Sequence, residues 1–387
     1  MKRLLPLECG RCGEKHDAFR LQTVCSRCGA PLLVRYDVET PGLPSLEEVC
    51  SRPRGQFRFP EMLPLSTGGE TPTLGEGATP LLAGEGLGAS LGLPRLRVKD
   101  EAQNPTGSFK ARGMAVALAW ARQHGVEAVC LPSAGNAGAA ASAYGALHGI
   151  EVHVAIPANT PEAIARECQM LGARVQRVEG TISEAGKWIA ERAPRAGWFN
   201  LATLREPGRI EGKKMMGYEL YWEMGRVPDV IFYPTGGGTG LIGMAKAFDE
   251  MQALGWIGSE RPRFVSVQLA GCDPIVRAFE AGKRACEACE DPPETAAFGL
   301  RVPKALGDFL ILEALQKTRG CAVAVTEEEI AAGCERMARH LGIWPCPEGG
   351  ACVAAAAKLG ARDWLAHDDL VVLFNTGSPL NYAGAPA

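Results

Sequence analysis

Strand and helix patterns alternate through the middle of the chain, and this alternation constrains the fold more than any other feature. Short apolar segments typical of strands are each followed, after a short loop, by a longer segment of helical composition. The expected strands cover residues 128–131, 151–157 and 174–178, and the helices that follow them end at 148, 171 and 192. Such repeats place their strands parallel, with right-handed crossovers. The sequence therefore predicts an α/β fold with an open, mostly parallel sheet.

A ten-residue stretch from Asn104 to Gly113 follows another expected strand and opens a helix expected at 111–123. Its proline and glycine mark a turn, and Ser108 or Thr106 can cap the helix. Lys110 then lies in the first helical turn, beside unpaired backbone N–H groups and the positive end of the helix dipole. Because this field disfavours an ammonium ion, the lysine is a candidate for the lowered pKa that an amine nucleophile needs. A solvated surface lysine is the alternative.

Five residues, Gly236 to Gly240, separate an apolar strand expected at 229–233 from a helix expected at 241–254. Four of the five are glycines, so backbone N–H groups can converge on an anion with no side chain in the way. The helix dipole assists, and Thr239 adds a hydroxyl. The sequence therefore predicts a phosphate site in this loop.

The identity of that phosphate is open. Gly238-x-Gly240-x-x-Gly243 matches the dinucleotide fingerprint, so an NAD-dependent oxidoreductase is a rival hypothesis. That fingerprint expects an acid about 20 residues further on, where the strand at 264–269 offers Gln268 instead. A P-loop is excluded, because no Gly-Lys-Ser/Thr sequence follows.

Two more loops follow expected strands, at the edge where open α/β sheets bind ligands. The loop Ser133–Gly138 has small residues that let a carboxylate approach the N–H groups of the next helix, and Asn136 adds an amide. Thr376 follows the last strand, expected at 369–374. An ordinary strand–helix turn is the alternative for the first loop.

The motif Asn104-Pro-Thr-Gly-Ser-Phe-Lys110 resembles the cofactor-lysine motif of threonine synthases and related fold-type II pyridoxal-phosphate enzymes, the tryptophan synthase β-like superfamily. The resemblance runs from about Glu76 to Tyr382. It implies that Lys110 is the catalytic residue and carries pyridoxal 5'-phosphate as a Schiff base. The residues that it implies for cofactor binding are Phe109, Asn136, Gly236, Gly237, Gly238, Thr239, Gly240 and Thr376.

The resemblance also bears on the substrate. It implies that a loop of four small residues grips the carboxylate of an amino acid; these are Ser133, Ala134, Gly135 and Ala137. Arg209, Lys213 or Lys214, in a stretch similar to the Arg-Ile-Glu-Gly of threonine synthases, can bind an anionic substrate tail. A solvated charged turn before a helix at 215–224 is the alternative expectation there. Glu348 is a further candidate for a substrate contact.

Two Cys-x-x-Cys pairs near the start of the chain form a metal-binding pattern. Four thiolates in this spacing predict a closed tetrahedral zinc site; they are Cys9, Cys12, Cys25 and Cys28. Zinc can fold so short a segment, and some threonine synthases carry a similar ribbon. Residues 1–36 contain seven Lys/Arg against three Asp/Glu, so a nucleic-acid-binding ribbon is an alternative. The segment has no long basic run, and we expect a structural cap.

Composition narrows the remaining classes. The net charge of −3 gives no field for polyanions, and no window approaches 18 uninterrupted apolar residues. The first apolar run is too short for a signal peptide. Fourteen cysteines in such a chain are expected to be thiols and metal ligands, with Cys286 and Cys289 as loop thiols. We therefore expect a cytoplasmic protein with no membrane or nucleic-acid partner.

The sequence predicts two open, mostly parallel sheet domains with the cofactor between them, plus the zinc ribbon. The expected parts are the ribbon (1–37), a large domain in two segments (38–124 and 206–387) and a small α/β domain (125–205). The expected function is a pyridoxal-phosphate-dependent carbon–oxygen lyase, threonine synthase-like, which converts O-phosphohomoserine to threonine and phosphate, as a homodimer. A serine or threonine dehydratase, a β-replacement synthase and, more distantly, the NAD-dependent oxidoreductase are the alternatives.

Overall fold

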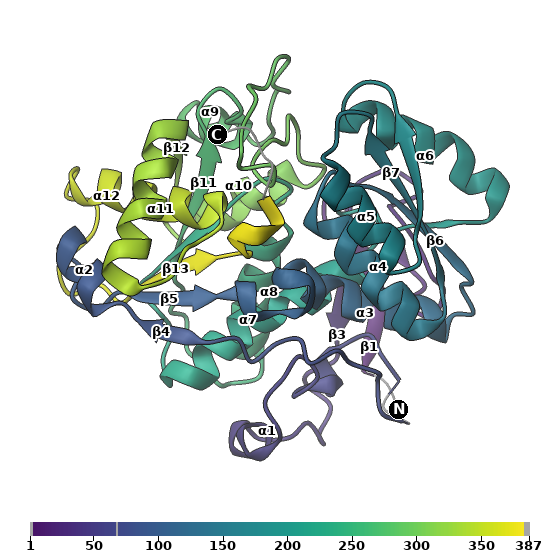
Figure 1. Ribbon diagram of the computed structural model, residues 1–387. Coiled ribbons are helices and arrows are strands. Elements are labelled where there is room, and N and C mark those ends of the chain that lie inside the picture. Colours follow the sequence, from purple (N-terminus) through teal and green to yellow (C-terminus); the bar gives the residue numbers. More distant parts are fainter. Residues whose placement is uncertain (1–2, 67–68, 383–387) are drawn as a thin grey trace. The chain divides into compact units, whose positions relative to one another are not determined.

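The computed structural model describes residues 3–66 and 69–382 of the 387-residue chain. The chain divides into two compact units, each built from two segments (Figure 1). Unit 1 comprises Met1–Ala78 and Asn104–Met215, and unit 2 comprises Thr79–Gln103 and Met216–Ala387. The expected α/β class with two mostly parallel sheets is confirmed, one sheet in each unit.

The N-terminal module of unit 1 is a small antiparallel sheet. Its strands, in the spatial order β2-β1-β3, are β1 (Leu4–Cys9), β2 (Lys15–His16) and β3 (Leu32–Tyr36). Leu7 and Val34 are fully buried, and Leu32, Leu33 and Tyr36 are nearly so. The segment after it contains α1 (Leu46–Ser51) and the 3-10 turn Pro60–Met62.

The main sheet of unit 1 has four parallel strands in the order β8-β7-β6-β9. They are β6 (Ala128–Pro132), β7 (Glu151–Pro157), β8 (Arg174–Val178) and β9 (Phe199–Asn200). Alternate residues point to opposite faces of each strand. One face, with Val129 and Leu131, packs on α3 (Lys110–Gln123), α4 (Asn136–His148) and α5 (Glu162–Met170). The other face, with Cys130, packs on α6 (Ile182–Ala196).

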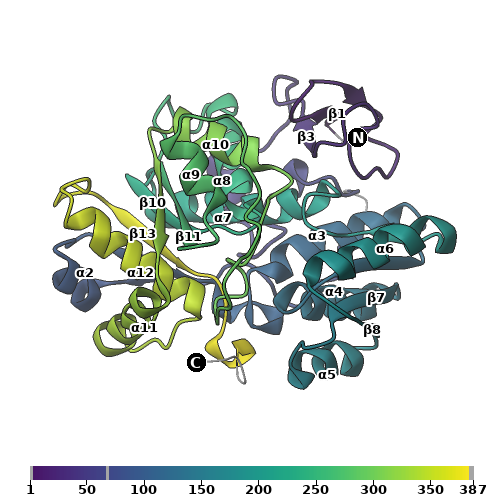
Figure 2. The ribbon, with the colours of Figure 1, turned by 90° about the horizontal axis from the view of Figure 1, so that it is seen from above.

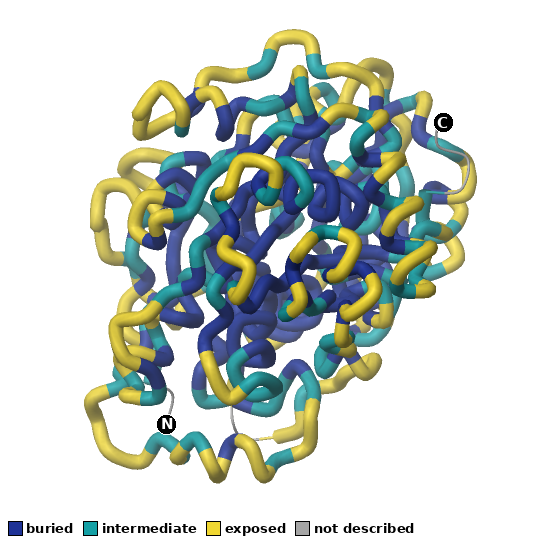
Figure 3. Tube along the Cα trace, turned by 90° about the vertical axis from the view of Figure 1, so that its left-hand side faces the viewer, coloured by how far each residue is buried: buried dark blue, intermediate teal, exposed yellow. Residues whose placement is uncertain are grey.

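The sheet of unit 2 has six strands in the order β12-β11-β10-β13-β5-β4, parallel except for the edge strand β4. They are β4 (Leu81–Ala83), β5 (Arg97–Asp100), β10 (Val230–Pro234), β11 (Arg263–Leu269), β12 (Cys321–Val325) and β13 (Val371–Asn375). Every residue of β10 and β13 is buried, and Figure 3 colours such buried segments dark blue. Continuous apolar strands of this kind are typical of a sheet covered on both faces.

Helices cover both faces of the unit 2 sheet. One face packs on α2 (Glu85–Leu91), α11 (Glu327–Leu341) and α12 (Pro347–Gly360). Figure 2 shows these three helices on one side and α8 (Thr239–Ala253) and α10 (Asp308–Lys317) on the other. The helix α9 (Pro274–Glu280) contacts β11 and β12. A capping box starts α11, with Thr326 as the N-cap and Glu329 as its second member.

Three expectations about helices need correction. Neither Ser108 nor Thr106 caps α3, which begins at Lys110 without a side-chain cap. The helix α6 continues to Ala196, with Pro194 inside it. The helix α7 (Gly208–Met224) begins seven residues before the expected start, so the charged stretch is helical. None of the helices in the described ranges combines the length and apolar character that a membrane span needs.

Candidate active site

The glycine loop of unit 2 follows β10, and its glycines are required by packing. A Cβ atom on Gly236 would lie 2.0 Å from the carbonyl oxygen of Gly299, and one on Gly238 would lie 2.2 Å from Ile311 Cδ1. Gly238 also has φ +74°, the left-handed conformation that favours glycine. It is the N-cap of α8 and offers no side chain to the first N–H groups of that helix. This uncapped helix start is suited to an anion.

Thr376 lies at the same edge of the sheet as the glycine loop. The strands β10 and β13 are hydrogen-bonded neighbours, with Phe232 opposite Leu373, and the loop and Thr376 follow their carboxyl ends. The threonine is buried, and its Oγ1 lies 3.7 Å from the Sγ of Cys346. Thr376 therefore offers a buried hydroxyl beside the proposed anion loop.

Glu348, which the sequence presents as a candidate for a substrate contact, is buried close to this edge of the sheet. Its Oε1 accepts a hydrogen bond of 2.8 Å from the backbone N–H of Gly299. Its Oε2 is buried and has no hydrogen-bond partner among residues 3–66 and 69–382. Burial and the nearby Glu348 carboxylate raise the pKa of the Cys346 thiol well above its ordinary value. This edge of the sheet therefore carries the carboxyl group of Glu348, the hydroxyl of Thr376 and the neutral thiol of Cys346.

Lys110 is the first residue of α3 in unit 1, one residue before the expected start, so it lies in the first helical turn as the sequence predicts. Its Nζ lies 3.9 Å from the ring centroid of Phe109, so the two side chains pack together. The Nζ of Lys213 lies 4.9 Å from the same centroid. Two amines from different helices thus share one aromatic ring, an arrangement that cation–π attraction stabilises when either is charged.

The helix α7 brings Lys213 to this place because it crosses α3 at two glycines. A Cβ on Gly212 would lie 2.0 Å from the carbonyl oxygen of Arg112. A Cβ on Gly113 would lie 3.0 Å from the carbonyl oxygen of Arg209 and 3.1 Å from Cε of Lys213. The two backbones therefore approach closely, and the lysine stem lies across the surface of α3.

The expectation of a solvated charged turn is wrong for this stretch. Arg209 is 2% exposed and Lys213 is fully buried. Nη1 of Arg209 donates to the carbonyl oxygen of Leu201, while its buried Nε has no hydrogen-bond partner in the part of the chain that the structure describes. An orphaned guanidinium N–H of this kind fits a bound anion.

The charges around these side chains shift their pKa values. Burial, together with the charges of Arg209 and Lys110, holds the pKa of Lys213 well below its ordinary value. Burial raises the pKa of Glu206 to about 7, although Arg209 opposes this shift. Burial also lowers the pKa of Arg209. An anion bound here would stabilise the charged forms of both basic side chains.

Lys214 is separated from this cluster. Its Nζ lies 2.7 Å from Oε2 of Glu211, and both side chains are fully buried. The same carboxylate oxygen accepts a hydrogen bond of 2.6 Å from the hydroxyl of Tyr36, at the end of β3. Of the three basic residues proposed for an anionic tail, the structure therefore gathers two.

The small-residue loop of unit 1 lies at the carboxyl end of β6, as predicted, and α4 begins at Asn136. Ser133 Oγ accepts a hydrogen bond of 2.8 Å from the N–H of Gly138 and donates one of 3.0 Å to the carbonyl oxygen of Gly135. The serine hydroxyl thus shapes the loop. The helix α4 packs against both α3 and the turn at Pro105–Gly107, so this loop and the Lys110 motif belong to neighbouring elements.

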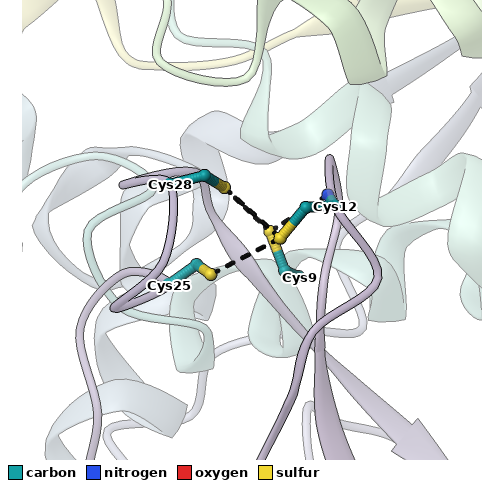
Figure 4. Close-up of side chains that lie close together, drawn as sticks. All are labelled: Cys9, Cys12, Cys25 and Cys28. Carbon is teal, nitrogen blue, oxygen red and sulfur yellow. Dashed lines mark hydrogen bonds between the residues drawn. The ribbon is translucent and has the colours of Figure 1, made fainter.

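The four N-terminal cysteines converge on one point (Figure 4). Their sulfur atoms all lie within 4.8 Å of one another, and the separation between Cys9 and Cys28 is 3.4 Å. A zinc ion with Zn–S bonds of about 2.3 Å needs sulfur atoms roughly 3.8 Å apart, so the cluster fits zinc. Burial opposes ionisation, but N–H bonds from Cys12 and Arg11 lower the pKa of Cys9 to about 7.

Each pair forms a similar turn. Gly13 and Gly29, at φ +72° and +71°, donate their N–H to the carbonyl oxygens of Cys9 and Cys25. In the described ranges, no second group of metal-binding residues forms around Cys286 and Cys289. Cys286 is a free thiol in a loop, as expected, but it is buried, and its N–H donates to Asp308.

The side chain of Gln268 weakens the dinucleotide alternative. Its amide donates to the carbonyl oxygen of Thr235 and accepts from the N–H of Ile275. Both bonds are buried and hold the loop that begins after β10. The position where a ribose-binding acid is expected therefore carries an amide with a structural role.

Comparisons with known proteins give one consistent result. Residues 72–377 match the family model described as pyridoxal-phosphate dependent enzyme. Threonine synthases from Methanosarcina acetivorans and Methanocaldococcus jannaschii are each 33% identical to this chain. Each alignment covers 96% of this chain, and 91% and 92% of the respective relative.

Solved structures share the fold. Maize serine racemase superposes with a TM-score of 0.68 at 21% identity, over 78% of this chain and 88% of that one. A fungal L-serine ammonia-lyase from Rhizomucor miehei superposes with a TM-score of 0.67 at 22% identity, over 79% of this chain and 97% of that one.

Proposed function

We propose that this chain, which belongs to the family of pyridoxal-phosphate-dependent enzymes as a threonine synthase-like lyase, converts O-phosphohomoserine to threonine and phosphate. The observation that carries the proposal is the pair of buried basic side chains, Arg209 and Lys213, beside Lys110. A phosphorylated amino acid is the kind of substrate that such a cluster suits. The relatives that are named threonine synthases extend over nearly the whole chain.

Pyridoxal phosphate, when bound, supplies an electron sink that lowers the cost of removing a proton beside an amino group. In the proposal, Lys110 is the amine that holds the cofactor and then moves the Cα proton. Its place in the uncapped first turn of α3 supports this role, because the helix dipole disfavours the ammonium form. The ring of Phe109, which packs against the Nζ of Lys110, would restrict the positions of this amine.

The remaining residues bind and orient. The N–H groups of the loop 236–240, with the Thr239 hydroxyl, would hold the phosphate of the cofactor. Thr376 would offer its hydroxyl to the ring nitrogen, and Asn136 its amide to the ring. A hydroxyl partner would leave the ring nitrogen less protonated than a carboxylate would, which is compatible with elimination and with replacement at Cβ. The loop 133–137 would grip the substrate carboxylate.

Three further statements complete the proposal. The four-cysteine cluster holds a structural zinc ion, which its sulfur spacing supports. The proposed domains, which divide the chain differently from the two compact units, are 1–37 for the ribbon, 125–205 for the small domain, and 38–124 with 206–387 for the large one. The enzyme works as a cytoplasmic homodimer without a nucleic-acid partner, which light scattering and salt-dependent binding assays test.

The deciding experiment is mass spectrometry after borohydride reduction of the purified protein. We expect a phosphopyridoxyl group on Lys110 and none after Lys110→Ala. Inorganic phosphate release is then compared between O-phosphohomoserine and O-phosphoserine, and ammonia release is measured with serine and threonine. A label on another lysine contradicts the assignment of Lys110. Ammonia from threonine, without phosphate release from O-phosphohomoserine, supports the dehydratase alternative instead.

A further inference from the structure

Tyr36 connects the N-terminal ribbon to the helix α7, entirely within unit 1. Its hydroxyl donates to Oε2 of Glu211 at 2.6 Å, and Nζ of Lys214 lies 2.7 Å from the same oxygen. The same Nζ lies 4.1 Å from the centroid of the tyrosine ring. The exposed fraction of Tyr36 is 8%, and Glu211 and Lys214 are fully buried. Three polar groups thus contact one another away from solvent.

The position of Tyr36 depends on the cysteine cluster. Tyr36 ends β3, and Leu32 at the other end of that strand pairs with Cys9. The N–H of Gly10 also donates to the carbonyl oxygen of Pro31, next to the second cysteine pair. A metal held by the four cysteines would act with these hydrogen bonds and with the buried apolar side chains of the module to fix the course of β3. A ribbon without metal would therefore lose one of the constraints that hold Tyr36 in place.

The contact reaches the helical turns that carry the buried basic residues. Side chains three and four residues apart share one face of a helix. Glu211 and Lys214 form the face that meets Tyr36, and Arg209 and Lys213 form the face that meets α3. A hydrogen bond on the first face therefore sets the rotation and translation of the second.

We propose that the ribbon positions the amino-terminal end of α7, so that Tyr36, Glu211 and Lys214 are positioning residues for the anion that Arg209 and Lys213 bind. This inference rests on the proposed function for the anion, but the mechanical link from ribbon to helix does not. Tyr36→Phe tests it by removing only the hydroxyl. Tyr221→Phe is the matched control, because Tyr221 lies later in α7 and donates to the carbonyl oxygen of Trp256.

The experiment compares wild-type holoenzyme, both variants and Cys28→Ser, with zinc content measured in each. Amide hydrogen exchange is followed for residues 208–214, and phosphate affinity by calorimetry, with Arg209→Met marking the site. We expect Tyr36→Phe to keep its zinc, to speed exchange in 208–214 about tenfold and to weaken phosphate binding about fivefold. Cys28→Ser is expected to lose zinc and show at least the same changes, and Tyr221→Phe to leave both measurements at wild-type values.

Three outcomes overturn the inference in different ways. Unchanged exchange of 208–214 in Tyr36→Phe refutes the link between ribbon and helix. Faster exchange with unchanged phosphate affinity refutes the positioning role and leaves the proposed function intact. A wild-type enzyme that binds no phosphate, or binds it equally after Arg209→Met, removes the anion site from the proposed function and from this inference together, whatever the exchange data show.

Discussion

Replacing Gly236 by alanine tests whether the loop after β10 holds the cofactor phosphate. The new Cβ would lie 2.0 Å from the carbonyl oxygen of Gly299 and 2.8 Å from Cγ2 of Val302. An ordinary carbon–oxygen contact is roughly 3.3 Å, so the loop must move by about 1.3 Å. Such a shift misaligns at least one N–H group from the phosphate. Losing one hydrogen bond to a charged group costs about 1.5–3 kcal/mol.

We therefore expect the dissociation constant of pyridoxal phosphate to rise about 10- to 150-fold in Gly236→Ala, measured by absorbance titration of the apoenzyme. Overpacking should also lower the free energy of unfolding by about 1–3 kcal/mol. Gly360→Ala is the matched control in unit 2, because its Cβ would meet nothing closer than Leu91 O at 3.8 Å. A Gly236→Ala enzyme that is destabilised but binds the cofactor with wild-type affinity would refute the phosphate assignment.

Three further predictions concern unit 1. Burial raises the pKa of Glu206 to about 7, above its ordinary 4.5, so between these pH values the folded state keeps a proton that the unfolded state has lost. The free energy of unfolding should therefore fall as pH rises through this range, by about 1.4 kcal/mol per pH unit. Denaturant titrations from pH 4.5 to 7.5 should show this slope, and Glu206→Gln should flatten it. Cys12→Ser should abolish zinc binding measured by mass spectrometry, and limited proteolysis should then cut within residues 3–36; retention of one zinc per chain contradicts the four-thiolate site. Gly212→Ala places a Cβ 2.0 Å from Arg112 O and should lower the melting temperature by several degrees, whereas Gly186→Ala, with its nearest contact at 3.9 Å, should not.

The site residues that could be located from the sequence are those whose roles follow from the local sequence pattern. The start of α3 at Lys110 and the loop before α8 follow from turn residues and from a strand–loop–helix order that any α/β chain must obey. The cysteine cluster follows from spacing, because two Cys-x-x-Cys turns can meet at one ion. In each case the prediction depends only on residues that lie close together in the sequence.

The burial of the basic side chains at the start of α7 could not be predicted in this way. A stretch with Arg209, Lys213 and Lys214 has the composition of a solvated turn, and only the approach of α7 to α3 buries it. The signal that existed was the spacing of Gly208 and Gly212, four residues apart on one helix face. A Cβ at either position would meet the backbone of α3 at 3.0 Å or less. Reading that spacing as a helix contact requires knowing the partner helix.

Two adjacent lysines lie in different surroundings in this stretch. Lys214 is buried in contact with Glu211 and Tyr36, so its charge is balanced within the fold. Lys213 is equally buried; burial and the charges of Arg209 and Lys110 lower its pKa, and Glu206 opposes this shift. Beside them, the buried Nε of Arg209 has no hydrogen-bond partner in residues 3–66 and 69–382. A phosphate bound at Arg209 would therefore satisfy a buried donor that the described part of the fold leaves unsatisfied.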